Sequence, residues 1–234
     1  AADGDRVRRG TADRGSRRGR GSVSGLNYNA PVGALARTGS WKETAARNLD
    51  IIELSKRLDT EKRAATPEEQ TLLAQYVGWG PADIRNKLFP STNSSLREIN
   101  PYAVSPDWRP LAERAAEMLS PEEVATAFQS TQYAHYTSEP MIRAIWSGLQ
   151  RLGFKGGNIL EPGMGTGLFA VASPSEVMEK SKYTGVEMDK ATARIARHLV
   201  PESNILNADF IKQKLPDNFF DLAIGNPPFS ATKI

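Results

Sequence analysis

The feature that most constrains the fold is the alternation of short apolar strands with helical segments after Gly156. We expect strands at residues 158–161, 183–187, 204–207 and 220–224, and a helix over residues 189–199. Strands that alternate with helices at this spacing form right-handed βαβ units and a parallel sheet. The sequence therefore predicts an α/β, Rossmann-like fold in which the loops after the strands meet at one edge, where ligands bind.

The stretch before this pattern, residues 40–151, reads as mainly helical. Ser40 can cap a helix that runs to about Leu58, and Thr66-Pro67-Glu68-Glu69 is a capping box that starts a helix ending at Gly78. Ser120-Pro121-Glu122-Glu123 repeats the capping pattern. We divide the chain into a tail (1–25), a helical subdomain (26–151) and an α/β core (152–234).

Most of the positive charge lies in the tail. Residues 1–25 hold seven arginines and three aspartates, a net charge of +4, whereas the whole chain carries +3, so the other residues sum to −1. Because the tail is rich in Gly and Ser and almost free of apolar residues, we expect it to be disordered. It can bind phosphates without specificity, or it can be a linker or a mistranslated upstream stretch, and the composition favours neither.

Several classes of protein are disfavoured by what the sequence lacks. There is no cysteine, and the two histidines, His135 and His198, are far apart in the sequence. We therefore expect neither a metal site nor a catalytic triad. No apolar run is long enough to span a bilayer and no signal peptide is evident, so we expect a cytoplasmic protein without a membrane partner.

A glycine-rich turn, Glu161-Pro162-Gly163-Met164-Gly165-Thr166-Gly167, follows the first expected strand directly. Glycines let a ligand approach the backbone closely and lie over the next helix N-terminus. A dinucleotide fingerprint requires glycine at position 168, where Leu168 stands, so an NAD-dependent oxidoreductase is disfavoured. Glu161 would repel a pyrophosphate but suits a ligand with an ammonium and a sulfonium.

Acidic residues end the next two strands. Glu187, at the end of the second strand, can accept both hydroxyls of a ribose, as in dinucleotide and S-adenosylmethionine sites. Asp209-Phe210 follows the third strand, and this pair can hydrogen-bond an adenine amine and cover the ring face.

The fourth strand runs into Asn226-Pro227-Pro228-Phe229. The amide oxygen of Asn226 and the carbonyl of Pro227 can accept hydrogen bonds from the two hydrogens of a planar amine. They then favour a more tetrahedral nitrogen whose lone pair faces a methyl donor. Pro228 restricts Pro227 to an extended conformation, and Phe229 offers a face on which an extruded base can stack.

This ordered set of motifs resembles the amino-methyltransferase family that modifies N6 of adenine in DNA. The resemblance implies S-adenosyl-L-methionine as cofactor and assigns catalysis to Asn226, Pro227, Pro228 and Phe229. It assigns cofactor binding to Tyr136, Thr137, Glu161, Pro162, Gly163, Gly165, Gly167, Glu187, Met188, Asp209 and Phe210. Tyr136-Thr137 resembles the motif that touches the methionine end of the cofactor. Tyr76-Val77-Gly78-Trp79-Gly80-Pro81 resembles the N-terminal methylase region of large phage- and plasmid-borne methylase–helicase proteins.

The resemblance implies that DNA is the partner, with a flipped-out adenine as target, and suggests a role in DNA modification or anti-restriction. Further strands, a target-recognition region and in some members a helicase domain follow the Asn-Pro-Pro-aromatic motif in this family. We therefore expect the sequence to be truncated after that motif and to be inactive on DNA alone. Two alternatives remain open: a methyltransferase acting on glutamine N5 in proteins or guanine N2 in RNA, and a non-catalytic module that binds S-adenosylmethionine or DNA.

Overall fold

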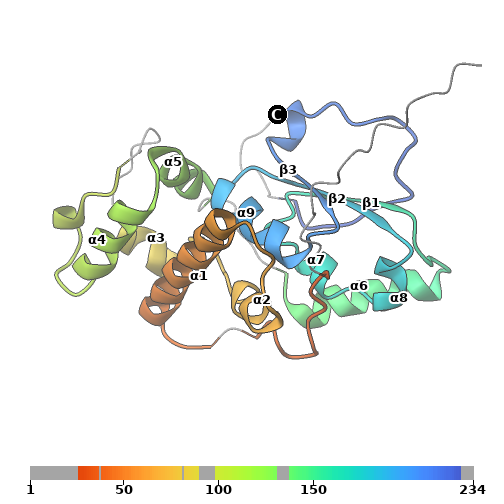
Figure 1. The fold of residues 1–234 in the computed structure, drawn as a ribbon, viewed down its shortest axis with the longest axis horizontal. Coiled ribbons are helices and arrows are strands. Elements are labelled where there is room, and N and C mark those ends of the chain that lie inside the picture. The colour runs from red at the N-terminus through yellow and green to blue at the C-terminus, as the bar shows by residue number, and fades with distance from the viewer. Residues whose placement is uncertain (1–25, 37, 81, 90–97, 131–136, 228–234) are drawn as a thin grey trace, which may run out of the picture.

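The computed structural model describes residues 26–36, 38–80, 82–89, 98–130 and 137–227 (Figure 1). The helices that precede the sheet are α1 (Trp41–Glu61), α2 (Pro67–Leu73), α3 (Ala82–Leu88), η1 (Pro101–Ala103), α4 (Arg109–Met118), α5 (Pro121–Ser130) and α6 (Glu139–Arg151). The remaining elements are β1 (Asn158–Pro162), α7 (Leu168–Val171), α8 (Ser175–Met178), β2 (Lys182–Glu187), α9 (Lys190–Leu199), β3 (Asn204–Asn207), η2 (Phe210–Lys212) and β4 (Leu222–Ala223). The expected tail, 1–25, lies outside the described residues.

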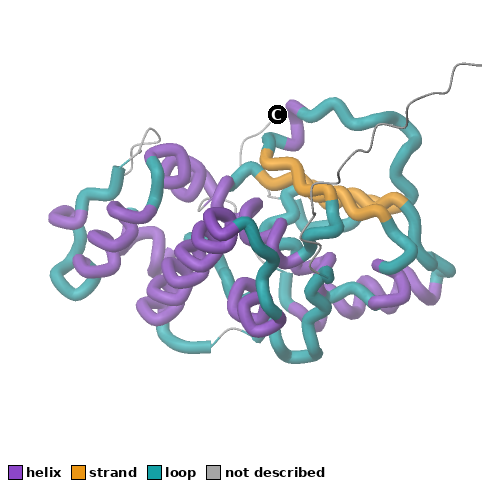
Figure 2. The backbone as a smooth tube through the Cα atoms, in the orientation of Figure 1, coloured by secondary structure: helices purple, strands orange, loops and turns teal. Residues whose placement is uncertain are grey.

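The four described strands form one parallel sheet in the order β3-β2-β1-β4 (Figure 2). Ile159 of β1 pairs with Tyr183 of β2 and with Leu222 of β4, so β1 lies inside the sheet. Because all strands run in the same direction, the loops after them meet at one edge. The predicted α/β, Rossmann-like arrangement is confirmed, although β4 is shorter than the expected 220–224.

The helices begin where the capping pattern places them. Ser40 and Glu43 form a reciprocal capping box at α1, and Thr66 and Glu69 form another at α2. One expectation is wrong: α2 ends at Leu73 rather than at Gly78. After Ala74 the N–H groups of Gln75 and Tyr76 donate to carbonyls three residues back, and that of Val77 donates to a side chain of α1.

Helix α9 joins the helical region to the sheet. In Figure 1 it lies between α1 and the strands, and it contacts α1, α2 and α5 as well as β2 and β3. Its buried positions include three alanines, Ala191, Ala193 and Ala196, whose small side chains let neighbouring elements approach closely. Helices α6, α7 and α8 lie beside the sheet (Figure 1).

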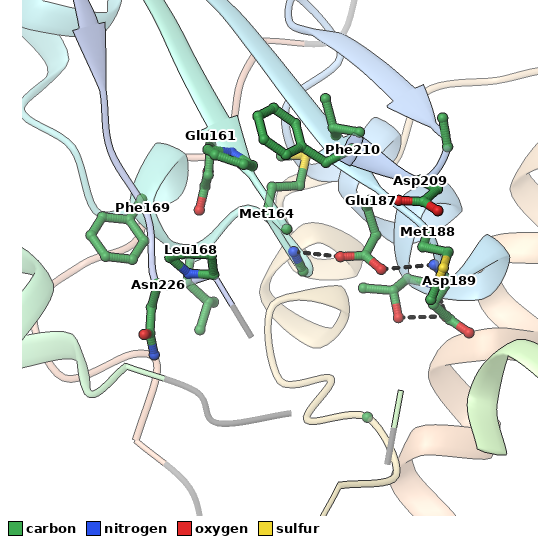
Figure 3. Close-up of a pocket in the computed structure, with 18 of the residues that line it drawn as sticks. Glu161, Met164, Leu168, Phe169, Glu187, Met188, Asp189, Asp209, Phe210 and Asn226 are labelled. Carbon is green, nitrogen blue, oxygen red and sulfur yellow. Dashed lines mark hydrogen bonds between the residues drawn. The ribbon is translucent and has the colours of Figure 1, made fainter. Parts of the chain in front are cut away.

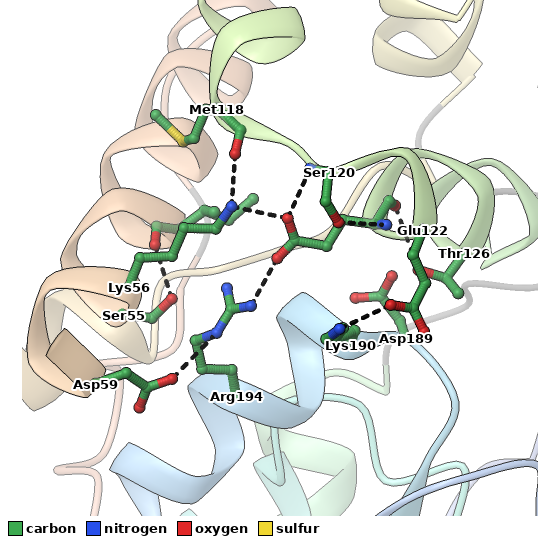
Figure 4. Close-up of polar contacts among 12 residues, drawn as sticks. Ser55, Lys56, Asp59, Met118, Ser120, Glu122, Thr126, Asp189, Lys190 and Arg194 are labelled. Carbon is green, nitrogen blue, oxygen red and sulfur yellow. Dashed lines mark hydrogen bonds and ion pairs between the residues drawn. The ribbon is translucent and has the colours of Figure 1, made fainter. Parts of the chain in front are cut away.

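A buried carboxylate reinforces this junction (Figure 4). Glu123 of α5 is 2% exposed, and its two oxygens lie 2.7 Å from Lys56 Nζ of α1 and 2.7 Å from Arg194 Nη2 of α9. It also accepts a hydrogen bond from the N–H of Ser120. Burial alone would raise the pKa of Glu123, but the donors from Lys56, Ser120 and Arg194 outweigh it and lower the pKa to about 2.

The segment before α1, residues 26–35, forms a strap along the core that ends in a turn at residues 32–35. Its Tyr28 N–H donates to the carbonyl of Leu199 at 2.7 Å, and its Ala30 N–H donates to that of Val171 at 2.8 Å. The N–H groups of Gly33 and Leu35 both donate to the carboxylate of Glu139 in α6. The strap therefore connects α6, α7 and α9 through backbone hydrogen bonds.

Candidate functional site

A cavity of about 340 Å³ opens at the carboxyl edge of the sheet (Figure 3). It is lined from the α/β core by Glu161, Pro162, Gly163, Met164, Gly165, Leu168, Phe169, Val186, Glu187, Met188, Asp189, Thr192, Ala208, Asp209, Phe210, Ile211, Asn226 and Pro227. Gly78, Thr137 and Ile142 line it from the preceding region. Its volume lies within the range of small-molecule sites, about 300–1,000 Å³.

The glycine turn forms the floor of this cavity. Gly163, Gly165 and Gly167 have φ angles of 61°, 58° and 82°, which side-chain-bearing residues rarely adopt. Met164 N–H donates to the carbonyl of Val186 at 3.0 Å, which attaches the turn to the neighbouring strand β2. At Gly163 and Gly165 the turn thus presents backbone, rather than a side chain, to whatever occupies the cavity.

Glu187, at the end of β2, lies directly beside the turn. Its Oε2 accepts a hydrogen bond from Gly165 N–H at 2.8 Å, and its Oε1 accepts one from Asp189 N–H at 2.7 Å. Burial and the nearby charge of Asp189 raise the pKa of Glu187 to about 7, although the backbone donors oppose the shift. Each carboxylate oxygen has a second lone pair that can accept from a ligand hydroxyl.

Glu161, at the end of β1, is the second carboxylate of the site. It is 2% exposed, and its Oε2 accepts a hydrogen bond from the hydroxyl of Tyr183 on β2. Burial raises the pKa of Glu161 to about 8, and the charge of Glu187 adds to the shift. A positively charged ligand would favour the ionised form of this group.

Two partly exposed side chains, Met188 and Phe210, lie on the β2 and β3 side of the cavity (Figure 3). Asp209 caps η2 by accepting from Ile211 N–H, and this turn holds Phe210 at the end of β3. The pair of an acid and an aromatic ring predicted after the third strand therefore lines the cavity. Together with Met188, the ring of Phe210 offers an apolar surface suited to a planar group.

Asn226 and Pro227 line the opposite side, and Figure 3 shows Asn226 across the cavity from Glu187. Hydrogen bonds with β1 fix this segment: the Asp221 N–H donates to the carbonyl of Asn158, and the Ile224 N–H donates to that of Leu160. Pro228 and Phe229 lie outside the described residues.

Thr137 also lines the cavity, ahead of α6, and its buried Oγ1 has no hydrogen-bond partner among the described residues. Tyr136 lies outside the described residues. The structure thus brings together all but one of the predicted site residues that it describes: Thr137, Glu161, Pro162, Gly163, Gly165, Glu187, Met188, Asp209, Phe210, Asn226 and Pro227. Gly167 does not line the cavity and instead starts α7.

Sequence reasoning missed several residues that line the cavity, among them Gly78, Ile142, Asp189 and Thr192. Asp189 caps α9 by accepting from the backbone N–H and the hydroxyl of Thr192. Its position as a helix cap two residues after Glu187 was a usable signal. Gly78 and Ile142 gave none, because only tertiary packing brings them to the sheet edge.

Residues 160–226 match a family model described as a methyltransferase domain, and the match runs from the β1 glycine turn to Asn226. This stretch is a methyltransferase domain. Its cofactor is S-adenosyl-L-methionine. The cavity suits that cofactor. Its two carboxylates can accept from hydroxyl and cationic groups, Thr137 adds a hydroxyl with no partner among the described residues, and apolar side chains can cover a ring.

Two curated relatives match parts of the chain that carries the methyltransferase domain. Defense against restriction protein B of Escherichia phage P1 is 31% identical over 97 residues, which cover 41% of this chain and 4% of the relative. Type II methyltransferase M.CvrRI of Paramecium bursaria Chlorella virus XZ-6E is 41% identical over 76 residues, 32% of this chain and 19% of the relative. The chain therefore matches only a small part of either relative.

Among solved structures, the type I restriction-modification system methyltransferase subunit from Streptococcus thermophilus is 18% identical, with a TM-score of 0.36. The similarity covers 79% of this chain and 45% of that subunit.

In the part of the chain that the structure describes, no cluster of three or more His, Asp or Glu side chains could hold a metal ion. None of the described helices is long and apolar enough to cross a membrane.

Proposed function

We propose that this S-adenosylmethionine-dependent methyltransferase methylates the N6 amine of adenine in DNA. The observation that carries the proposal is the position of Asn226 and Pro227. They follow β4 at the carboxyl edge of the sheet and line the same cavity as the glycine turn and Glu187. An amine bound by these two residues would lie within reach of a methyl donor held by the turn.

The chemistry explains why an amide and a carbonyl are needed. The lone pair of the adenine amine is delocalised into the ring, so the nitrogen is a weak nucleophile. When the Asn226 side-chain oxygen and the Pro227 carbonyl accept its two hydrogens, the nitrogen becomes more tetrahedral and its lone pair points towards the donor. The cofactor supplies a methyl group on a positively charged sulfur.

The proposed reaction is one displacement. The amine nitrogen forms a bond to the methyl carbon, the carbon–sulfur bond breaks with its electrons going to sulfur, and one amine proton leaves to solvent. Positive charge would pass from the sulfur to the amine nitrogen in this step and would leave the cavity with the released proton. Glu161, which is buried, and Glu187, which is half-buried, would hold the cationic and ribose ends of the cofactor.

DNA as the substrate is favoured by the two relatives, one named as a type II methyltransferase and the other as a defence against restriction. We extend the proposal to DNA modification or anti-restriction on that basis. An adenine inside a duplex cannot reach a cavity at a sheet edge, so the target would have to be extruded from the stack. We assign Phe229, next to Asn226-Pro227 in the sequence, the role of stacking on the extruded base.

The test is transfer of a labelled methyl group by the full-length protein to three substrates in parallel: duplex DNA, ribosomal RNA and a protein carrying the glutamine of a release factor. We expect label in DNA only, recovered as N6-methyladenine after digestion. Label in glutamine or in guanine would contradict the proposed substrate. Cofactor binding without transfer to any of the three would instead identify a binding module.

A further inference from the structure

One wall of the cofactor cavity comes from the helical region rather than from the methyltransferase domain. Gly78 lines the cavity although it lies in the loop between α2 and α3, well before the family match at residues 160–226. Gly78 is buried and has a φ of 64°. Its backbone can approach a ligand because no side chain stands in between.

A single buried side chain holds this loop. Asn48, in the middle of α1, is 0% exposed. Its Nδ2 donates to the carbonyl of Gly78 at 2.7 Å, and its Oδ1 accepts from the N–H of Val77 at 3.2 Å. The amide therefore satisfies one backbone group on each of two successive residues, the N–H of Val77 and the carbonyl of Gly78. Burying a polar side chain is costly unless its donor and acceptor atoms form hydrogen bonds, as those of Asn48 do here.

Aromatic residues on either side fix the loop further. Tyr76 and Trp79 are each 2% exposed and pack edge to face, with ring centroids 6.5 Å apart. Trp79 also packs edge to face on Phe89, which follows α3. Gly78 is thus the one position between these anchors that faces the cavity. A loop held this firmly presents a preformed surface.

We propose that the loop of residues 76–80 is part of the S-adenosylmethionine site, with Gly78 as a contact and Asn48 as the residue that positions it. The helical region then completes the cofactor site instead of being a separate module. This inference rests on the cofactor and not on the identity of the methyl acceptor. It is therefore tested by binding alone.

The first experiment is hydrogen exchange of the wild-type protein with and without S-adenosylhomocysteine, the demethylated product. We expect slower exchange in peptides covering residues 76–80 as well as in those covering the turn at 161–167. Protection of 161–167 alone would overturn the role of the loop and leave the cofactor assignment intact. Protection of neither would contradict both.

The second experiment replaces the contact. Gly78→Ala adds a Cβ at the cavity wall, and Gly153→Ala is its control, because Gly153 also has a positive φ, 95°, but open space around it. Both variants carry the same kind of backbone strain. We expect calorimetry to show affinity for S-adenosylhomocysteine about tenfold weaker, or more, in Gly78→Ala only. Equal affinities in the two folded variants would overturn the proposal.

The third experiment tests positioning. Asn48→Ala removes the two hydrogen bonds to Val77 and Gly78. The control, Ser55→Ala, alters another fully buried polar residue of α1, whose hydroxyl donates to the carbonyl of Ile52 within the helix. Both changes lower the melting temperature if their role is structural. We expect only Asn48→Ala to weaken S-adenosylhomocysteine binding and to remove the ligand-induced protection at 76–80. Retention of that protection in Asn48→Ala would show that Asn48 does not position the loop.

Discussion

The hydroxyl of Tyr183 donates a 2.5 Å hydrogen bond to Oε2 of Glu161, joining the two central strands directly beneath the cofactor cavity. Both side chains are buried, and burial, together with the charge of Glu187, raises the pKa of Glu161 to about 8. Without a ligand, Glu161 is therefore mostly protonated near neutral pH. Binding of a cation beside it favours loss of that proton.

This pair predicts a pH-dependent preference for the charged cofactor. S-adenosylmethionine and S-adenosylhomocysteine share the amino and carboxylate groups and differ in the sulfonium, so the ratio of their affinities isolates the response to its charge. We expect the preference for S-adenosylmethionine to grow as pH rises through about 8, because more of Glu161 is ionised. Calorimetric titrations at several pH values measure the ratio.

The matched variant for this experiment is Glu161→Gln, which can still accept from Tyr183 but cannot ionise. Its affinity ratio should change less than that of the wild type as pH rises through 8, because Glu187, with a pKa of about 7, is the carboxylate that still ionises in the cavity. A wild-type ratio that stays flat would show that Glu161 does not respond to the charge of the sulfonium.

Asn226→Ala should separate methyl transfer from cofactor binding. Asn226 lies across the cavity from Glu187, so its loss removes a hydrogen-bond acceptor for the amine and leaves the turn unchanged. We expect the rate of methylation to fall by about 10²–10³ while affinity for S-adenosylhomocysteine stays the same. Asn204→Ala, at the exposed start of β3, is the control and should alter neither quantity. Loss of both quantities in Asn226→Ala would mean that the segment after β4 is structural.

Gly165→Val should have the opposite effect. The φ of Gly165 is 58°, its N–H donates to Glu187, and it lines the cavity. A branched side chain there is strained and fills the path of the ligand, so we expect cofactor binding to be lost. Gly153→Val, at a φ of 95° with open space around it, should retain binding. Undiminished binding by folded Gly165→Val would exclude the turn from the site.

Glu123 predicts an acid-sensitive junction. Its pKa is lowered in the folded protein to about 2, below the ordinary value of 4.5, so its stabilising contribution is present above pH 4.5 and is lost as pH falls towards 2. Glu123→Gln should lower the free energy of unfolding at neutral pH by on the order of 3 kcal/mol. The difference from wild type should shrink as pH falls below about 4.5.

Urea denaturation across this pH range measures the effect. Glu122→Gln on the same helix is the control, since its ion pair with Lys190 is largely exposed and should contribute only about 0–1 kcal/mol. A pH-independent difference between Glu123→Gln and wild type would contradict an ionic origin.

Much of the α/β core could be predicted because its sequence patterns are local. The expected strand at residues 204–207 coincides with β3, and the strands expected at 158–161 and 183–187 differ from β1 and β2 by one residue each. Apolar runs that end in glycines or acids mark strand ends whatever the rest of the chain does. The residues at those ends line one cavity because parallel strands share an edge.

What could not be predicted depends on contacts between distant residues. The end of α2 was placed too late, since nothing near Leu73 shows that Val77 donates to Asn48. Glu123 was recognisable as a capping residue from its spacing to Ser120, but its pairing with Lys56 and Arg194 depends on how α1, α5 and α9 meet. Gly78 likewise lines the cavity only because elements far apart in the sequence pack together.

The strap of residues 26–35 cannot form its native hydrogen bonds until much later parts of the chain have been synthesised. Tyr28 and Ala30 leave the ribosome early, but the carbonyls that receive their N–H groups belong to Leu199 and Val171. At ordinary translation speeds the acceptor on Leu199 is made roughly 10–30 s after Tyr28. The segment translated before all the other described residues is thus among the last to reach its native position. Until then its backbone donors are open to chaperones or to neighbouring nascent chains.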